Sequence, residues 1–161
     1  MDATAPDDST NTARATARLQ QELLQMLNNP AEGISAFPSE ENLLLWNAVI
    51  LGPAGSPYEN LEFRLSIQFC SQYPFQPPKV QFLTGCFHPN VMLRVPGDIC
   101  LDILQNAWSA VMSTSSVLVS LQSLLAEPNP ASPLNAEAAD LWVKDRKAYT
   151  EKVLQFHGQH P

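Results

Sequence analysis

Apolar and polar residues alternate most regularly over residues 61–69, where five apolar side chains would share one face of a half-buried strand. Shorter apolar runs over residues 34–37, 43–51 and 79–83 are bounded by turn-forming residues, which predicts three further strands. Because the connections between these segments are short, the pattern favours a four-stranded antiparallel meander.

Helical spacing of apolar residues predicts helices on both sides of this sheet in the chain. The first helix is expected from Ala13 to residue 29, with a stripe that begins at Leu19 and with Arg14, Arg18 and Glu22 beside the stripe. We therefore expect an α+β fold, in which the meander is flanked by this N-terminal helix, a central helix and two C-terminal helices. The last three helices are predicted over residues 113–127, 135–144 and 145–156.

The chain divides into a short tail and one domain. Residues 1–12 contain one methionine and no other large apolar residue, which predicts a disordered tail. Residues 13–161 then form a single domain, large enough to bury a core without disulfides or metal. The tail lacks the apolar core of a signal peptide, and no run approaches the roughly 20 apolar residues that span a bilayer, so we expect no membrane partner.

Charge and cysteine usage narrow the function classes. The formal net charge of −7 argues against nucleic acid as a principal partner, because an acidic protein repels phosphate backbones. Three cysteines at irregular spacing, without a signal peptide, favour reduced thiols. We therefore expect the protein in the cytoplasm and nucleus.

The segment from residue 86 to residue 108 holds most of the candidate chemistry, including two of the three cysteines. Unstructured loops longer than about 12–15 residues are usually functional or disordered, and the apolar content of this one favours function. Residue types leave three schemes open for Cys100. It is a nucleophile with His88 as its base, or a thiol that carries an acyl group beside an oxyanion donor such as Asn90, or a zinc ligand. A zinc site would take Cys86, His88 and Cys100, with Asp98 or Asp102.

Three motifs in this segment resemble the active-site signature of the ubiquitin-conjugating enzymes: His88-Pro89-Asn90, the run from Gly97 to Leu104, and Trp108-Ser109. Residues 73–80 and 123–130 resemble two further segments of that family, and the resemblance covers residues 14–157. Residues 33–38, 82–86 and 132–135 are most similar to one branch, the ubiquitin-conjugating enzymes C, which serve the anaphase-promoting complex in mitosis.

The resemblance implies an acyl-transfer reaction without a cofactor or a metal. Cys100 would accept ubiquitin as a thioester from the ubiquitin-activating enzyme. A lysine of a protein substrate would then attack the thioester with the help of a RING-type ubiquitin ligase, for that branch the anaphase-promoting complex. Two alternatives remain: a non-catalytic ubiquitin-binding variant of the same fold, and a carrier of another ubiquitin-like modifier.

The family resemblance also assigns roles around the thiol. Asn90 would stabilise the oxyanion of the tetrahedral intermediate or hold the loop in which it forms, and His88 would mainly fix Asn90. Asp102 would fix the loop after Cys100. Ser132 stands where many members carry an acidic residue that positions the incoming lysine.

The same resemblance implies docking surfaces, and the chain departs from the family pattern in three ways, which concern access to the site, the ligase-binding surface and docking to the activating enzyme. Eleven residues separate His88 from Cys100 where nine are usual, Ala110 replaces a common proline, and the chain has only four lysines. Val119 would contact the donor ubiquitin. The ligase-binding residues would be Arg14, Arg18, Phe75, Ser109 and Ala110.

Overall fold

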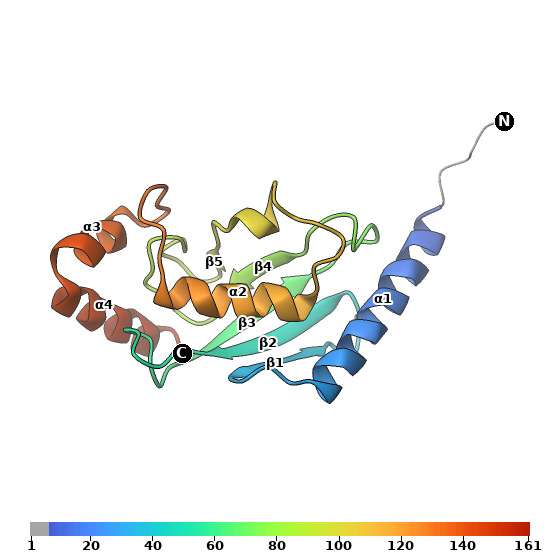
Figure 1. Cartoon of the computed structure of the whole chain (residues 1–161), viewed down its shortest axis with the longest axis horizontal. Helices are drawn as coiled ribbons and strands as arrows, with labels where there is room; N and C mark the ends of the chain where they lie inside the picture. The colour runs from blue at the N-terminus through green and yellow to red at the C-terminus, as the bar shows by residue number, and fades with distance from the viewer. Residues whose placement is uncertain (1–6) are drawn as a thin grey trace.

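The computed structural model describes residues 7–161, which form four α-helices, a short 3-10 helix and a five-stranded sheet (Figure 1). The strands are β1 (Ile34–Pro38), β2 (Leu45–Leu51), β3 (Glu62–Gln68), β4 (Lys79–Phe82) and β5 (Gly97–Asp98). The helices are α1 (Asp8–Asn28), the 3-10 helix η1 (Asp102–Leu104), α2 (Thr114–Ala126), α3 (Ala136–Lys144) and α4 (Arg146–Gln159).

The sheet is an antiparallel meander, as the sequence predicts. Strands pair in chain order from β1 to β5, and every pair is antiparallel. Leu65 of β3 lies opposite Ala48 of β2 and Phe82 of β4, and all three side chains are buried. The alternation over residues 61–69 therefore predicts both the strand and its buried face.

The helices pack against the sheet and complete the hydrophobic core. In Figure 1, α2 crosses the sheet, α1 lies at one end of it, and α3 and α4 lie together at the other end. Within residues 7–161, no helix is both long and apolar enough to cross a membrane. The buried residues of α2 are Thr114, Val117, Leu118, Leu121 and Leu125.

Two differences from the prediction are larger than a shift of two or three residues. A fifth strand, β5, lies inside the predicted long loop, because two residues are too few to show an alternating pattern. Helix α1 begins at Asp8 rather than Ala13, where the Asp7 carboxylate accepts a hydrogen bond from the Thr10 N–H at 2.9 Å. Residues 8–12 of the predicted disordered tail are therefore helical, and residues 1–6 lie outside the described residues.

The buried face of α1 also differs from the predicted stripe. Leu19 is buried, but Leu27 is exposed and the acidic Glu22 is buried in its place, with 3% of its surface exposed. The Glu22 carboxylate compensates for this burial by accepting hydrogen bonds from three donors, which are described below. Hydropathy alone cannot indicate such a residue, because two of its three hydrogen-bond donors come from distant segments.

Candidate active site

Backbone hydrogen bonds fix the segment that carries Cys100. The Cys100 N–H donates to the Asn90 carbonyl oxygen at 2.8 Å, and Val91 pairs with Ile99 in an isolated antiparallel bridge. Strand β5 precedes this bridge, and η1 follows the cysteine. These bonds hold the segment rigidly, and Cys100 itself is half-buried, so solvent can reach it.

The side chain of Asn90 ties this segment to the connector between α2 and α3. Its Nδ2 donates to the Asn129 carbonyl oxygen at 2.7 Å, and its Oδ1 accepts from the Asn129 N–H at 2.9 Å. The carbonyl oxygen of the neighbouring Pro89 accepts from the N–H groups of Leu134 and Asn135. The bond to Asn129 uses one of the two Nδ2 hydrogens, which leaves the second for an acceptor such as an oxyanion.

His88 supports Asn90 from the core. Its Nδ1 accepts from the Asn90 N–H at 2.9 Å, so the ring carries its hydrogen on Nε2, which donates to the Leu124 carbonyl oxygen at 2.7 Å. The ring is fully buried, and this burial lowers its pKa from 6.5 to about 4. His88 is therefore a neutral structural residue at neutral pH.

Two buried tyrosines fix the residue before His88. The Tyr58 hydroxyl donates to the Phe87 carbonyl oxygen and accepts a hydrogen bond from the Tyr149 hydroxyl of α4. Burial raises the pKa of both phenols, so both remain protonated donors. The His88-Pro89-Asn90 motif is thus anchored to α2, to α4 and to the α2–α3 connector.

The three schemes for Cys100 fare differently in this geometry. A His88 base is wrong, because both ring nitrogens bond other groups and the ring is neutral. Cys86 is buried, which raises the pKa of its thiol, and within residues 7–161 no three His, Cys, Asp or Glu side chains are grouped so that they could hold a metal ion. Asp102 accepts from the Ile103 N–H at 2.8 Å within η1, as expected for a loop-fixing carboxylate. A partly exposed thiol on a residue whose backbone N–H is bonded to the Asn90 carbonyl oxygen fits the acyl-carrying scheme.

Ser132 and the longer loop flank the site. Ser132 is exposed on the α2–α3 connector, two residues before Leu134, which bonds Pro89. The loop over residues 92–96, to which the sequence comparison assigns the two additional residues, is exposed except at the half-buried Met92. Asp98 closes this loop by an ion pair with Arg94 and a 2.6 Å hydrogen bond from Gln81.

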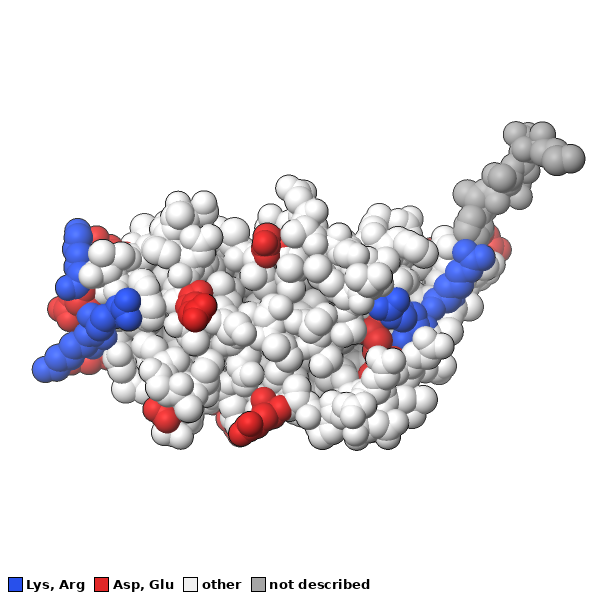
Figure 2. Space-filling view, viewed as in Figure 1, with Lys and Arg blue, Asp and Glu red and all other residues white. Residues whose placement is uncertain are grey.

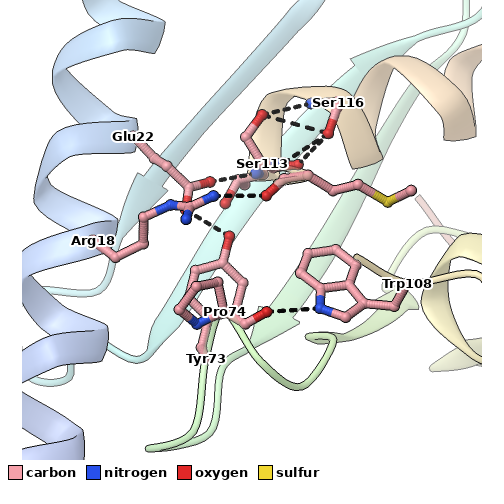
Figure 3. A network of polar contacts seen from close by, with 9 residues as sticks. Arg18, Glu22, Tyr73, Pro74, Trp108, Ser113 and Ser116 are labelled. Atoms are coloured by element: carbon pink, nitrogen blue, oxygen red, sulfur yellow. Dashed lines mark hydrogen bonds and ion pairs between the residues drawn. The ribbon is translucent and has the colours of Figure 1, made fainter. Parts of the chain in front are cut away.

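The predicted ligase-binding loops lie side by side. The Trp108 indole N–H donates to the Pro74 carbonyl oxygen at 2.8 Å, which joins the loop over residues 71–78 to the loop over residues 105–113 (Figure 3). We call these the proline-rich loop and the Trp108 loop. Phe75 is 75% exposed on the first, and Ser109 is exposed on the second. Ala110 is half-buried, whereas Val111, which the motif comparison missed, is 88% exposed.

The remaining predicted contact residues divide by exposure. Arg14 is exposed on α1, but the Arg18 side chain is only 27% exposed and bonds both Glu22 and the Met112 carbonyl oxygen. Val119 is exposed on α2, a helix that contains no charged residue. Val111 lies between Ala110 and Met112, and no pattern in the sequence marks its side chain as exposed.

A meander sheet that presents a partly exposed cysteine next to a rigid Asn90 loop fits a protein that carries an acyl group on a thiol. The model of the ubiquitin-conjugating enzyme family matches residues 18–157. The chain belongs to this family, so ubiquitin, an activating enzyme and a ubiquitin ligase are its general partners.

Individual relatives agree with this assignment. The chain is 48% identical over 141 residues to "Ubiquitin-conjugating enzyme E2 2" of Fusarium solani, covering 88% of this chain and 92% of the relative. It is 49% identical over 141 residues to "Ubiquitin-conjugating enzyme E2-20 kDa" of Schizosaccharomyces pombe, covering 87% and 79%. These relatives do not bear the name of the C branch that the sequence motifs resemble most.

Proposed function

We propose that Cys100 is the residue that carries ubiquitin. In the first step, the Cys100 sulfur attacks the carbonyl carbon of the thioester on the activating enzyme, a new C–S bond forms, and the activating enzyme's thiol leaves. In the second step, a lysine amine attacks the same carbon, the C–N bond of an isopeptide forms, and the C–S bond breaks. The amine proton passes to solvent or to the departing sulfur, which restores the thiol.

The single observation that carries this proposal is the frame around Cys100. Its N–H is bonded to the carbonyl oxygen of Asn90, whose side chain is itself fixed by Asn129. The frame keeps the Asn90 amide on a segment that is paired with the cysteine, which supports an oxyanion-stabilising role for this amide. A thioester is already activated for acyl transfer, so a strong base next to the sulfur is not required.

Two surfaces would hold the partners. Phe75 and Val111 project from the two joined loops, and exposed apolar side chains of this size are typical of a docking surface, here for a RING-type ligase. The middle of the face shown in Figure 2, over α2, carries few charged side chains, whereas Lys and Arg gather at its two ends. We assign the donor ubiquitin to the uncharged surface of α2 around Val119.

Ser132 would act by position rather than by proton transfer. A serine hydroxyl is not a general base near neutral pH, so orientation and desolvation of the lysine amine would dominate the second step. The connector that carries Ser132 is hydrogen-bonded to the carbonyl oxygen of Pro89, next to Asn90. This bond would keep the connector in place while the lysine amine approaches.

We further propose service to the anaphase-promoting complex and a location in cytoplasm and nucleus. The first rests on the likeness of residues 33–38, 82–86 and 132–135 to the C branch. The relatives named above carry other designations, so a different ligase is the competing candidate. The second is supported by the three cysteines, all of which are free thiols.

A loading assay tests the function. The protein is incubated with activating enzyme, ubiquitin and ATP and run on a gel with and without reductant. We expect a ubiquitin-sized shift that reductant removes, that Cys100→Ala abolishes, and that becomes resistant to reductant in Cys100→Ser, because an oxyester survives thiols. A shift that persists unchanged in Cys100→Ala would refute the assignment of this cysteine.

The same assay separates the alternatives. Loading with another ubiquitin-like modifier and its activating enzyme, but not with ubiquitin, would identify a carrier of that modifier. No loading with any modifier, together with measurable binding of free ubiquitin, would identify a non-catalytic variant. Loaded protein is then mixed with the anaphase-promoting complex and with unrelated RING domains, and faster discharge with the former alone would support the mitotic role.

A further inference from the structure

The buried carboxylate of Glu22 is the centre of a polar network that the reaction described above does not use (Figure 3). Its Oε2 accepts from the Arg18 Nε at 3.1 Å and from the Tyr73 hydroxyl at 2.6 Å. Its Oε1 accepts from the Thr114 N–H at the start of α2. Hydrogen bonds to a charged group with little solvent around it are among the stronger ones in proteins, so these bonds fix the groups that make them.

The donors to Glu22 lead directly to both docking loops. Tyr73 belongs to the proline-rich loop and lies two residues before Phe75. Thr114 follows the Trp108 loop. Within that loop, the carbonyl oxygen of Met112 accepts a hydrogen bond from a terminal guanidinium nitrogen of Arg18 at 2.8 Å. One carboxylate on α1 therefore holds a point on each loop, while the Trp108–Pro74 hydrogen bond joins the loops to each other.

The exposed ends of these loops cannot fix themselves. Phe75 and Val111 make few contacts with the rest of the protein, since 75% and 88% of their surfaces are exposed. Their separation is set by the backbone that carries them, and that backbone is anchored through Tyr73, Met112 and Thr114. A partner that contacts both side chains at once would therefore depend on Glu22, although Glu22 is too deeply buried to touch it.

We propose that Glu22 is a positioning residue that sets the relative placement of the proline-rich loop and the Trp108 loop, and through them the response to a RING-type ligase. This inference rests on the proposed ligase-binding function of the two loops. It assigns to a buried acid on α1 a role in the ligase-dependent step, rather than in folding alone.

The decisive variant is Glu22→Gln, which keeps the size of the side chain but offers one acceptor oxygen in place of two. An NH₂ group then faces either the Thr114 N–H or the Tyr73 and Arg18 donors, so one loop loses its anchor. Tyr73→Phe is the milder second variant, because it removes one donor and preserves the ring. Thr84→Val is the matched control, since it removes a buried hydroxyl that accepts from the Arg64 N–H at 2.9 Å, at the opposite end of the β3–β4 hairpin.

The readout is a ratio of two rates measured on the same loaded protein. Discharge of the ubiquitin thioester to free lysine is followed with and without the RING domain that stimulates the wild-type protein most. We expect this stimulation ratio to fall about five-fold in Glu22→Gln, within the range typical of residues that couple distant sites, and less in Tyr73→Phe. Thr84→Val should keep the wild-type ratio at a matched loss of thermal stability.

A spectroscopic measurement reports the loops directly. The indole N–H signal of Trp108 should shift in the NMR spectrum of Glu22→Gln and exchange faster with solvent, because its bond to Pro74 joins the two loops. The same signal should be unchanged in Thr84→Val. A purely structural role for Glu22 predicts equal effects on the ratio and on this signal for both variants at equal stability, and that result would overturn the inference.

Phe75→Ala separates failure of the inference from failure of the function. If Phe75→Ala abolishes stimulation but Glu22→Gln and Tyr73→Phe retain the wild-type ratio, the positioning role is wrong and the docking surface stands. If Phe75→Ala retains full stimulation, or if no RING domain stimulates the wild-type protein, the docking surface is wrong and the inference falls with it. The double variant Glu22→Gln/Phe75→Ala should be no slower than Phe75→Ala, since both act on one contact.

Discussion

Replacing Asn90 by alanine removes a side chain with two separable contributions, one to stability and one to the reaction. The amide makes two hydrogen bonds with the backbone of Asn129, at 2.7 and 2.9 Å. At roughly 1 kcal/mol each, their loss should lower the free energy of unfolding by about 2 kcal/mol, because Asn129 is exposed and water can satisfy its freed groups. For a domain of this size, the melting temperature should fall by about 4–8 °C.

The contribution to the reaction is larger and is measured separately. If the second Nδ2 hydrogen of Asn90 donates to the oxyanion, its removal should slow discharge to lysine by about 10²–10³-fold. The protein is loaded with ubiquitin, the activating enzyme is stopped by removing ATP, and the thioester band is followed after lysine is added. Only the loaded fraction is scored, so a loading defect does not affect the rate.

The control is a variant that loses stability but keeps the amide. Tyr149→Phe removes the hydroxyl that bonds Tyr58, which anchors the other side of the His88-Pro89-Asn90 motif. We expect its discharge rate to remain within about three-fold of wild type, as for a buried hydrogen bond with little effect on the reacting atoms. If Asn90→Ala slows discharge no more than Tyr149→Phe does, the oxyanion role of Asn90 is refuted, and the amide only holds the α2–α3 connector.

Three further predictions concern the surroundings of the site. The pKa of His88 is about 4 in the folded protein and about 6.5 in the unfolded chain, so the unfolded chain binds more protons between these two pH values. Neutral His88 should therefore contribute about 3 kcal/mol to the free energy of unfolding above pH 6.5, and this contribution should be lost as the pH falls towards 4. Denaturant titrations across this range should show a weaker pH dependence for His88→Gln, and an equal dependence would contradict the burial argument. Val119→Asp should reduce ligase-stimulated discharge by about ten-fold by adding a charge to the uncharged α2 surface, whereas Val143→Asp, on exposed α3, should not, and equal losses would remove α2 as the ubiquitin surface. Arg94→Ala should change the melting temperature by no more than about 2 °C, because its ion pair is solvent-exposed, and a larger fall would show that the 92–96 loop contributes to the core.

The strands could be predicted from the sequence where burial of one face imposes a period of two. The alternation over residues 61–69 predicts β3 correctly, because every second side chain along the strand is buried on the same face of the sheet. Strand β5 could not be predicted, since Gly97 and Asp98 pair with β4 without offering any pattern. The early start of α1 depends on one capping carboxylate, that of Asp7. The sequence could not identify Asp7 as the cap, because several residues of the tail are of types that commonly cap helices.

At the site, residue types and spacing identify the candidate residues more readily than they assign a role to each of them. By residue type alone His88 is a candidate base, whereas the family resemblance implies that it fixes Asn90, and its buried bonds to Asn90 and Leu124 agree with the second role. The helical pattern places Glu22 beside the apolar stripe, because an acidic residue is expected at the surface unless donors are present to satisfy it. Two of its three donors are 51 and 92 residues away in the chain. Long-range polar partners of this kind leave no periodic signal.

The arrangement of fixed and missing groups suggests where this enzyme obtains its rate. The carbonyl oxygen of Asn90 and the backbone of Asn129 hold the thiol segment rigidly, yet His88 is neutral, and Ser132, which stands where the family resemblance implies an acidic residue, is not a general base. The roles proposed for these residues therefore include no acceptor for the lysine proton. The reactive geometry must then be supplied by restricting the ubiquitin tail and the incoming amine, which is an entropic contribution worth several kcal/mol in well-oriented reactions. A ligase that contacts Phe75 and Val111 can supply that restriction only if both side chains stand at a fixed separation. Rapid transfer would therefore require the network around Glu22 as well as the cysteine, and this is why the stimulation ratio, rather than the extent of loading, is the quantity that should respond to changes in the network.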